Sequence, residues 1–244
     1  MPQQQQQLLR YTSTDPTVDY DINVTPLYEY IGNSDWKAAS TRCQQYPQEA
    51  GTWVVRYRRD SNGNRLTENG SNNNSSNGVL WRFLPIHSAC ALGPPTYFIR
   101  ALLQSYPSGT HTLDEQGMLP LHYACGSRIS REALYLLLMS YPRAALKSDP
   151  NGMLPIHYLA RWGPGEEGSI DMVCVATGKE HVMNWKDGDG NTPEMLARSA
   201  GYEGCEEVAR RIREFGRGGD GSSGGGGGSI NSNTKGLTVQ TTVS

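Results

Sequence analysis

The sequence predicts an all-α repeat solenoid, in which stacked helix–turn–helix units carry β-turn fingers and one elongated β-hairpin is inserted. The pattern Leu-Pro-[Leu/Ile]-His occurs at 84–87, 119–122 and 154–157, a spacing of 35 residues. A Tyr-Pro pair follows the first two of these patterns, 21 and 22 residues after the pattern's proline. Apolar residues between the two markers recur near the helical period. A fixed period of this length indicates a chain built from repeated helical pairs.

Two weaker copies extend the repeat. Thr192-Pro193-Glu194-Met195 lies 38 residues after the third pattern, and Thr25-Pro26-Leu27-Tyr28 lies 59 residues before the first, which is one period plus an insertion. The five predicted units are about 20–58, 79–113, 114–148, 149–186 and 187–215. The remaining segments hold too few apolar residues to offset their ordering entropy. We therefore expect a disordered Gln-rich N-terminus (1–19), a mobile Asn/Ser-rich hairpin loop (59–78) and a disordered Gly/Ser/Asn-rich tail (216–244).

Each unit is predicted to open with a turn. Its sequence is Asp-x-x-Gly, at Asp114, Asp149 and Asp187, and its glycine can adopt a positive φ. A proline then occupies the first position of a short helix, where its missing N–H costs nothing. These structural prolines are Pro85, Pro120, Pro155 and Pro193.

A second, longer helix is predicted in each unit. It begins near a candidate N-cap at Thr96, Ser130 or Ser169, and the Tyr-Pro pair ends it. The last unit carries many charged residues, which are typical of a solubilising terminal cap. The first unit instead carries the bulky residues Tyr20, Tyr28, Tyr30 and Trp36, for which packing on the base of the hairpin is one interpretation.

The insertion is predicted to be an elongated β-hairpin. Segments 53–58 and 79–84 both alternate, with Trp81 and Phe83 on one face of the second segment. Its basic residues, set against Asp60 and Glu68, give a local net charge of +3, whereas 101–215 carries −4. Three interpretations stay open: a solvated edge protected by arginines, a contact arm for an acidic partner, and nucleic-acid binding. The basic hairpin residues are Arg56, Arg58, Arg59, Arg65 and Arg82.

The repeated pattern resembles the ankyrin repeat, a β-turn followed by two helices with a T-P-L-H-x-A signature. Leu119-Pro120-Leu121-His122-Tyr123-Ala124 is the best copy. Leucine replaces threonine in three copies, and Tyr-Pro replaces the usual Gly-Ala after the second helix. The resemblance implies that His87, His122 and His157 fix the turns through hydrogen bonds. Stacked helices lie about 8–10 Å apart, so these three histidines cannot share one metal ion.

Several patterns resemble catalytic motifs but lack the required context. Residues 163–168 match G-x-G-x-x-G without a preceding strand, and 221–225 match G-x-S-x-G inside the glycine tail. Residues 187–191 begin like a calcium loop but lack its Gly and Glu at positions six and twelve. We therefore expect no enzyme activity, and no catalytic, cofactor-binding or metal-binding residues.

Composition narrows the class of partner. The net charge of −2 gives no global basic field for nucleic acid or anionic membranes, and no apolar run approaches the ~18 residues of a membrane span. The N-terminal residues do not form a signal peptide, and five cysteines without a C-x-x-C pair suggest a reducing compartment. We expect a monomeric protein in the cytoplasm or nucleus.

The resemblance places partner contacts on the fingers and on the exposed edge of the first helices. Met118, Met153 and Trp162 would form an exposed apolar stripe there. The alternative is that each is half-packed on the next unit; it stands equal for Trp162, whereas contact with a partner is favoured for the two methionines. The expected function is a non-enzymatic protein–protein interaction module with an unidentified protein partner. Alternatives are a regulatory or targeting subunit tethered by its Gly-rich tail, an enzyme, or a nucleic-acid binder. The candidate partner-binding residues are Trp81, Phe83, Glu115, Gln116, Met118, Ser127, Pro150, Asn151, Met153, Arg161, Trp162, Asp189, Asn191 and Arg198.

Overall fold

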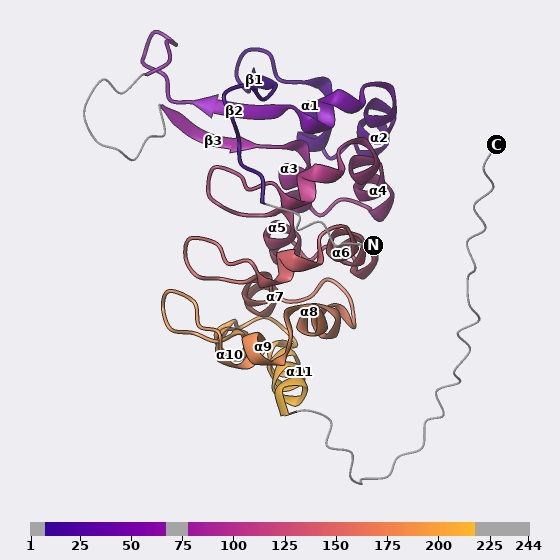
Figure 1. The fold of residues 1–244 in the computed structure, drawn as a ribbon, viewed down its shortest axis with the longest axis vertical. Helices are drawn as coiled ribbons and strands as arrows, with labels where there is room; N and C mark the ends of the chain where they lie inside the picture. Colours follow the sequence, from indigo (N-terminus) through magenta and orange to yellow (C-terminus); the bar gives the residue numbers. More distant parts are fainter. Residues whose placement is uncertain (1–7, 67–77, 218–244) are drawn as a thin grey trace, which may run out of the picture.

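The computed structural model describes residues 8–66 and 78–217. Within these ranges the chain is mostly helical, with eleven α-helices, three short 3-10 helices and a small three-stranded sheet. Figure 1 shows an elongated stack with the sheet at one end and the last helix at the other. No helix in the described part of the chain is long and apolar enough to span a membrane.

Five pairs of helices make up the stack. The pairs are α1 (Pro26–Gly32) with α2 (Trp36–Gln45), α3 (Pro85–Leu92) with α4 (Thr96–Ser105), α5 (Pro120–Gly126) with α6 (Arg131–Ser140), α7 (Pro155–Trp162) with α8 (Ser169–Thr177), and α10 (Pro193–Ser199) with α11 (Cys205–Arg217). The first helices contact one another in chain order, and so do the second helices (Figure 1). A continuous apolar core runs between these two columns.

The Tyr-Pro pairs end the second helices as predicted. Each proline opens a 3-10 helix that the sequence did not reveal: Pro47–Gly51, Pro107–His111 and Pro142–Leu146. The fourth unit has no Tyr-Pro pair, and the α-helix α9 (Lys179–Asn184) takes this place. The extra three residues of this unit lie in the loop between α7 and α8, where Gly163 and Gly168 both have positive φ.

The fingers form the predicted turns. The carboxylates of Asp114, Asp149 and Asp187 each accept a hydrogen bond from the backbone N–H four residues later, at 2.7–2.8 Å. The glycine of each finger has a φ of 75–85°. This conformation strains residues that have a Cβ atom, which is why glycine recurs there.

One of the three predicted N-caps is confirmed. The Ser130 hydroxyl accepts a hydrogen bond from Ala133 N–H and caps α6. Thr96 and Ser169 are instead the first helical residues, after Pro95 and Gly168 at the cap positions. Proline and glycine therefore end the preceding loop one residue earlier than the hydroxyl side chains suggested.

The predicted hairpin consists of β2 (Trp53–Tyr57) and β3 (Val79–Phe83), which pair antiparallel. A third strand, β1 (Thr17–Asp19), pairs parallel with β2. Trp53, Val54 and Val55 are all buried, so β2 has no solvent face along this part. The alternation predicted an exposed face because it could not show that the N-terminal segment covers the sheet.

The expectation that 1–19 is disordered is therefore corrected for residues 8–19. Leu9 forms a β-bridge with Thr112, and the Tyr11 ring packs edge-on against Trp53 with centroids 5.6 Å apart. Backbone hydrogen bonds to distant segments stabilise this stretch despite its low apolar content. Residues 1–7, residues 67–77 of the predicted mobile loop and residues 218–244 of the predicted tail lie outside the described residues.

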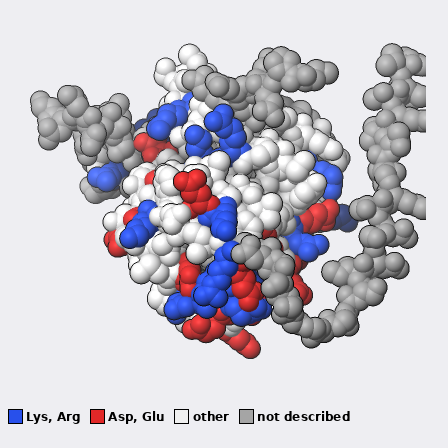
Figure 2. Space-filling model, turned by 60° about the horizontal axis from the view of Figure 1, so that its bottom comes forward, with Lys and Arg blue, Asp and Glu red and all other residues white. Residues whose placement is uncertain are grey.

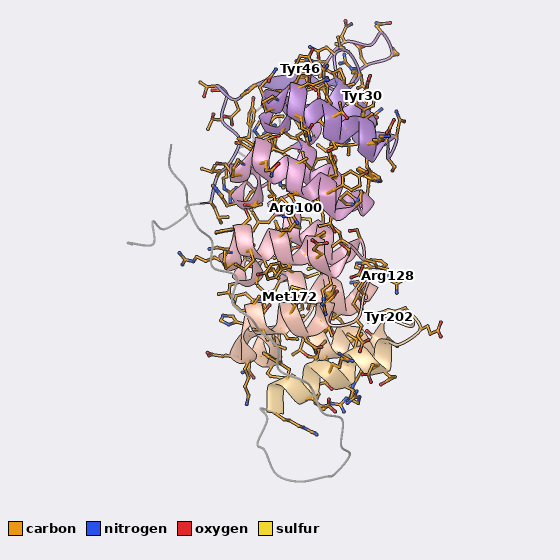
Figure 3. The ribbon with its side chains drawn as sticks, turned by 90° about the vertical axis from the view of Figure 1, so that its right-hand side faces the viewer. Tyr30, Tyr46, Arg100, Arg128, Met172 and Tyr202 are labelled. Carbon is orange, nitrogen blue, oxygen red and sulfur yellow. The ribbon has the colours of Figure 1, made fainter. Side chains whose placement is uncertain are left out.

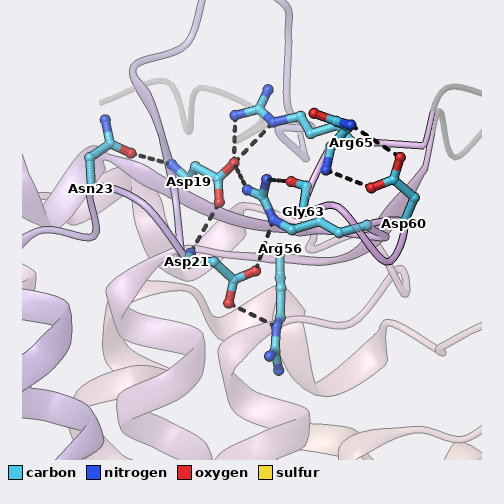
Figure 4. Close-up of polar contacts among 9 residues, drawn as sticks. Asp19, Asp21, Asn23, Arg56, Asp60, Gly63 and Arg65 are labelled. Atoms are coloured by element: carbon cyan, nitrogen blue, oxygen red, sulfur yellow. Dashed lines mark hydrogen bonds and ion pairs between the residues drawn. The ribbon is translucent and has the colours of Figure 1, made fainter.

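The positive charge of the hairpin is largely neutralised inside the molecule. Asp19 accepts hydrogen bonds from Arg59 and Arg65, each with a shortest N–O distance of 2.6 Å, and Arg56 pairs with Asp21 at 3.3 Å (Figure 4). Burial disfavours the charged form of Asp19, but hydrogen bonds from Arg65, the Asp21 N–H and Arg59 outweigh it and lower its pKa. The net charge of +3 counted from the sequence omitted these carboxylates, which β1 brings to the hairpin.

A further hairpin arginine, Arg82, is also paired with a carboxylate. Arg82 pairs with Glu115 at 2.7 Å and lies over the Tyr11 ring. Arg58 lies beyond β2, where its backbone N–H donates to Gly78 O. The surroundings of the hairpin favour the interpretation of a protected edge over that of a basic contact arm.

The opposite end of the stack is highly charged. Helix α11 carries Arg210, which pairs with Glu207 and Glu214, and Arg211, which pairs with Asp171. Figure 2 shows these red and blue side chains gathered at that end. The pattern agrees with the expected solubilising cap, since charged side chains keep the terminal helix pair hydrated.

Candidate protein-binding surface

A depression of about 360 Å³ lies on the first-helix face between α5 and α7. Two small residues, Ala91 and Gly126, line it together with larger aromatic ones. A Cβ atom at Gly126 would lie only 3.6 Å from Tyr158 and 3.7 Å from Trp162. The depression is lined by Ala91, Met118, His122, Tyr123, Gly126, Ser127, Tyr158 and Trp162.

Trp162 is the most prominent side chain of this face. It is 54% exposed although it ends a helix in the middle of the stack. It also borders a second depression of about 500 Å³ towards α10, lined by Arg161, Trp162, Asn191, Leu196, Ser199, Ala200, Gly201 and Tyr202. Trp162 is therefore half-packed against the next unit, as the alternative expected, and about half of its surface remains available for contact.

Two tyrosines of the depression are fixed by buried carboxylates. Tyr123 donates its hydroxyl hydrogen to Asp114 at 2.6 Å, and Tyr158 donates to Asp149 at 2.7 Å. Burial and the adjacent carboxylate raise the pKa of both tyrosines. Burial also raises the pKa of Asp114. The sequence analysis missed both tyrosines, although their spacing of 35 residues was a usable signal.

The histidines of the pattern have the predicted structural role. In His87, His122 and His157 one ring nitrogen, Nδ1, accepts from the backbone N–H of the preceding leucine at 3.0–3.3 Å. Nε2 of His87 and His122 contacts the carbonyl oxygens of Thr112 and Lys147. The ring must donate here, because Nδ1 already accepts. Burial lowers the pKa of all three, that of His87 to about 4.

His157 differs from the other two. Its buried Nε2 makes no hydrogen bond of good geometry among the described residues, although the backbone of Trp185 lies near enough to act on its pKa. The equivalent acceptor would be the carbonyl of Trp185, which follows α9 rather than a 3-10 helix. The change of helix type in this unit thus coincides with the loss of one hydrogen bond.

Aromatic side chains continue this face towards the hairpin. Phe83 packs edge-on against Tyr123 at 5.9 Å, and Trp81 stacks on Phe83 at 5.4 Å. Tyr20 and Tyr28 pack on Trp81, as suggested for the base of the hairpin, whereas Trp36 packs on Phe98 of α4 and Tyr30 is exposed. Trp81 and Phe83 therefore adjoin the candidate surface but are partly covered by their neighbours.

Met118 and Met153 do not form an exposed stripe, which corrects the sequence-based expectation. Each is only 9% exposed. The Tyr158 hydroxyl from the next unit lies 3.9 Å from the sulfur of Met118. The sequence indicated that these positions follow the finger, but it could not show that the next unit covers them.

The other predicted contact residues are divided between surface and framework. Gln116, Pro150, Asn151, Asp189 and Arg161 are exposed. Glu115 is exposed but paired with Arg82, and Arg198 with Glu194. The half-buried Ser127 donates its hydroxyl hydrogen to Cys90 O at 2.6 Å. The backbone N–H of the half-buried Asn191 donates to the Asp187 carboxylate within the same finger.

One edge of the stack is closed by the loops between helices. Arg128, which has a φ of 58°, extends over the Tyr202 ring, with its guanidinium carbon 5.8 Å from the centroid (Figure 3). The Tyr202 hydroxyl in turn donates to Ala160 O at 3.0 Å. These contacts connect the third, fourth and fifth units and stabilise the helix ends that carry Trp162.

No group of His, Cys, Asp and Glu within the described ranges is arranged to hold a metal ion. No protein-family model and no curated protein sequence matches this chain.

Proposed function

We propose that this chain is an ankyrin-like repeat protein that acts as a non-enzymatic module for protein–protein interaction. The observation that carries the proposal is Trp162, an exposed tryptophan between two depressions on the first-helix face. Tryptophan, tyrosine and arginine are enriched in the energetic centres of protein interfaces. The Tyr123 and Tyr158 rings beside it are held rigid by their carboxylates, which lowers the entropic cost of binding.

The arrangement of the helices supports the ankyrin-like assignment. Each first helix starts at a proline, follows a finger in three units, and stacks on the first helix of the neighbouring unit. The histidine hydrogen bonds are those that the resemblance implies. Stacked units of this kind act through an extended concave surface, and the fingers and first helices line one face of this molecule.

The test is affinity capture with matched surface variants. We expect Trp162→Ala to lose the captured protein, because it removes the central aromatic contact. Tyr135→Ala, on the second-helix face, should retain it. The two side chains are similarly exposed, 54% and 51%, so the comparison isolates the face. Equal capture by both variants and the wild type, with unchanged melting temperatures, would overturn the proposal.

A further inference from the structure

The polar groups that line the depression between α5 and α7 have little donor capacity left. The hydroxyl hydrogens of Tyr123, Tyr158 and Ser127 are all donated to acceptors inside the protein. The second ring nitrogen of His122 donates to Lys147 O. The hydroxyl oxygens keep acceptor capacity, so the lining suits a group that brings its own donors.

The electrostatic surroundings have the same preference. Asp114 and Asp149 lie behind the two tyrosines and are only 6% and 5% exposed. Neither carboxylate forms an ion pair with a cation of the described residues, and no lysine or arginine lines the depression. A partly desolvated carboxylate attracts a cation more strongly than an exposed one does. Arg161, outside the lining, is a cation whose charge acts on Tyr158, but the two buried carboxylates outnumber it, so the field in the depression favours positive charge.

The aromatic rings of the lining are the third feature that favours a cation. Elsewhere in the described chain, arginines lie over Tyr11, Tyr46 and Tyr57 with their guanidinium carbons 3.6–3.9 Å from the ring centroids. No arginine of the described residues is placed in this way over Tyr123 or Tyr158. Trp162 already has the Arg161 guanidinium carbon 5.7 Å from its centroid, and Arg161 lines the second depression but not the first.

We propose that this depression binds an arginine side chain in an extended segment of the partner protein. The inference rests on the proposed function and specifies the partner's chemistry. The planar guanidinium would stack on the Tyr158 and Trp162 rings and donate to the hydroxyl oxygens of the lining. Lysine fits less well, because its compact ammonium group is strongly hydrated and cannot stack as a plane.

The test uses three capped peptides of sequence Gly-Ser-X-Ser-Gly, in which X is arginine, norleucine or glutamate. Binding is followed by the NMR signal of the Trp162 indole N–H in the full chain, assigned by its loss in Trp162→Ala. We expect the arginine peptide to shift this signal with a dissociation constant in the millimolar range, and to bind about tenfold more tightly than the norleucine peptide. A tenfold ratio corresponds to about 1.4 kcal/mol. The glutamate peptide should bind more weakly still.

Two variants separate the contributions. Asp149→Asn keeps an oxygen that can accept the finger hydrogen bonds but removes the charge, and it should weaken arginine-peptide binding several-fold. Tyr135→Ala, on the other face, should leave it unchanged. If Asp149→Asn lowers the melting temperature, the salt dependence of the wild type gives the same information. Affinity should fall several-fold between 20 and 300 mM salt, as charge attraction requires.

The outcomes distinguish this inference from the proposed function. Tighter binding of the glutamate peptide would identify Arg161 as the relevant charge and overturn the arginine inference, while Trp162 would remain a binding residue. Equal binding of arginine and norleucine peptides, or no shift of the Trp162 signal at 10 mM arginine peptide, would also overturn it. The proposed function fails separately, if Trp162→Ala leaves the affinity capture unchanged.

Discussion

Units 114–148 and 149–186 share one framework but differ on their exposed surface. Both have a finger aspartate bonded to a tyrosine hydroxyl and a histidine bonded to the backbone before its helix. At the end of the first helix, however, Gly126 and Ser127 in one unit correspond to Arg161 and Trp162 in the other. The buried positions are constrained by hydrogen bonding and packing, whereas the helix end is free to vary.

A second difference lies inside the framework. A 3-10 helix ends the first of these units and α9 ends the second, and the Nε2 of His157 loses the bond that His122 makes. Although the two units are similar in sequence, the fourth therefore lacks a hydrogen bond that stabilises the third.

Acidification should destabilise the fold. The buried histidines have lowered pKa values in the folded state, so below about pH 6.5 the unfolded chain binds more protons and stability falls as pH falls. His87 alone, with a pKa of about 4, contributes about 3 kcal/mol between pH 6.5 and pH 4, of which about 2 kcal/mol is lost by pH 5. Asp114 opposes the trend weakly, because its raised pKa favours the protonated folded form at low pH. Urea unfolding at pH 7, 6 and 5 measures the slope, and a flat profile would contradict it.

Replacing the histidine should destabilise the protein more in the third unit than in the fourth. His122→Ala leaves Leu119 N–H and Lys147 O without partners and opens a cavity, so we expect a loss of about 3 kcal/mol. His157→Ala opens a similar cavity but removes only one hydrogen bond, so it should cost about 2 kcal/mol. Urea unfolding at pH 7.5, where both histidines are neutral, gives the difference. Equal losses would show that the Nε2 bond of His122 contributes nothing.

The methionines after the fingers should behave as core residues in both units. Met118→Ala and Met153→Ala should each lower the free energy of unfolding by about 2 kcal/mol, because each side chain is almost fully buried. Chemical denaturation measures the effect. Met139→Ala, at a position 60% exposed, is the control and should change stability by less than about 0.5 kcal/mol. A change of that size at Met118 would restore the exposed-stripe hypothesis.

Exchanging the helix-end residue should have the smallest effect on stability. Trp162→Ser gives the fourth unit the residue that the third has at Ser127. Since Trp162 is more than half exposed, we expect a change within about 0.5 kcal/mol. Thermal unfolding provides the measurement. A loss above 2 kcal/mol would mean that Trp162 belongs to the framework rather than to the binding surface.

Much of the helical framework was predictable from local chemistry. Proline at the start of each first helix, glycine at a positive φ in each finger and proline after the tyrosine each restrict the backbone on their own. The hairpin followed from alternation. The N-caps at Thr96 and Ser169 were wrong by one residue, because the neighbouring proline and glycine set the boundaries.

The candidate surface was only partly predictable. Trp162 and Arg161 were identified from their register, but Tyr123 and Tyr158 were missed. The two methionines were expected to be exposed, whereas both are buried. A residue's position within one unit does not show what the next unit places over it. The charge of the hairpin was misjudged for the same reason, since Asp19 and Arg65 meet only through strand pairing.

The sequence by itself determined the order of the paired helices, the fingers and the hairpin, because these depend on backbone restrictions within a few residues; it did not determine β1, α9 or the 3-10 helices. The tertiary structure alone decided which side chains are exposed and which charges are compensated. Burial and pairing depend on segments far apart in the chain, such as β1 against β2 and Tyr158 over Met118. The depression beside Trp162 exists only because neighbouring units are stacked.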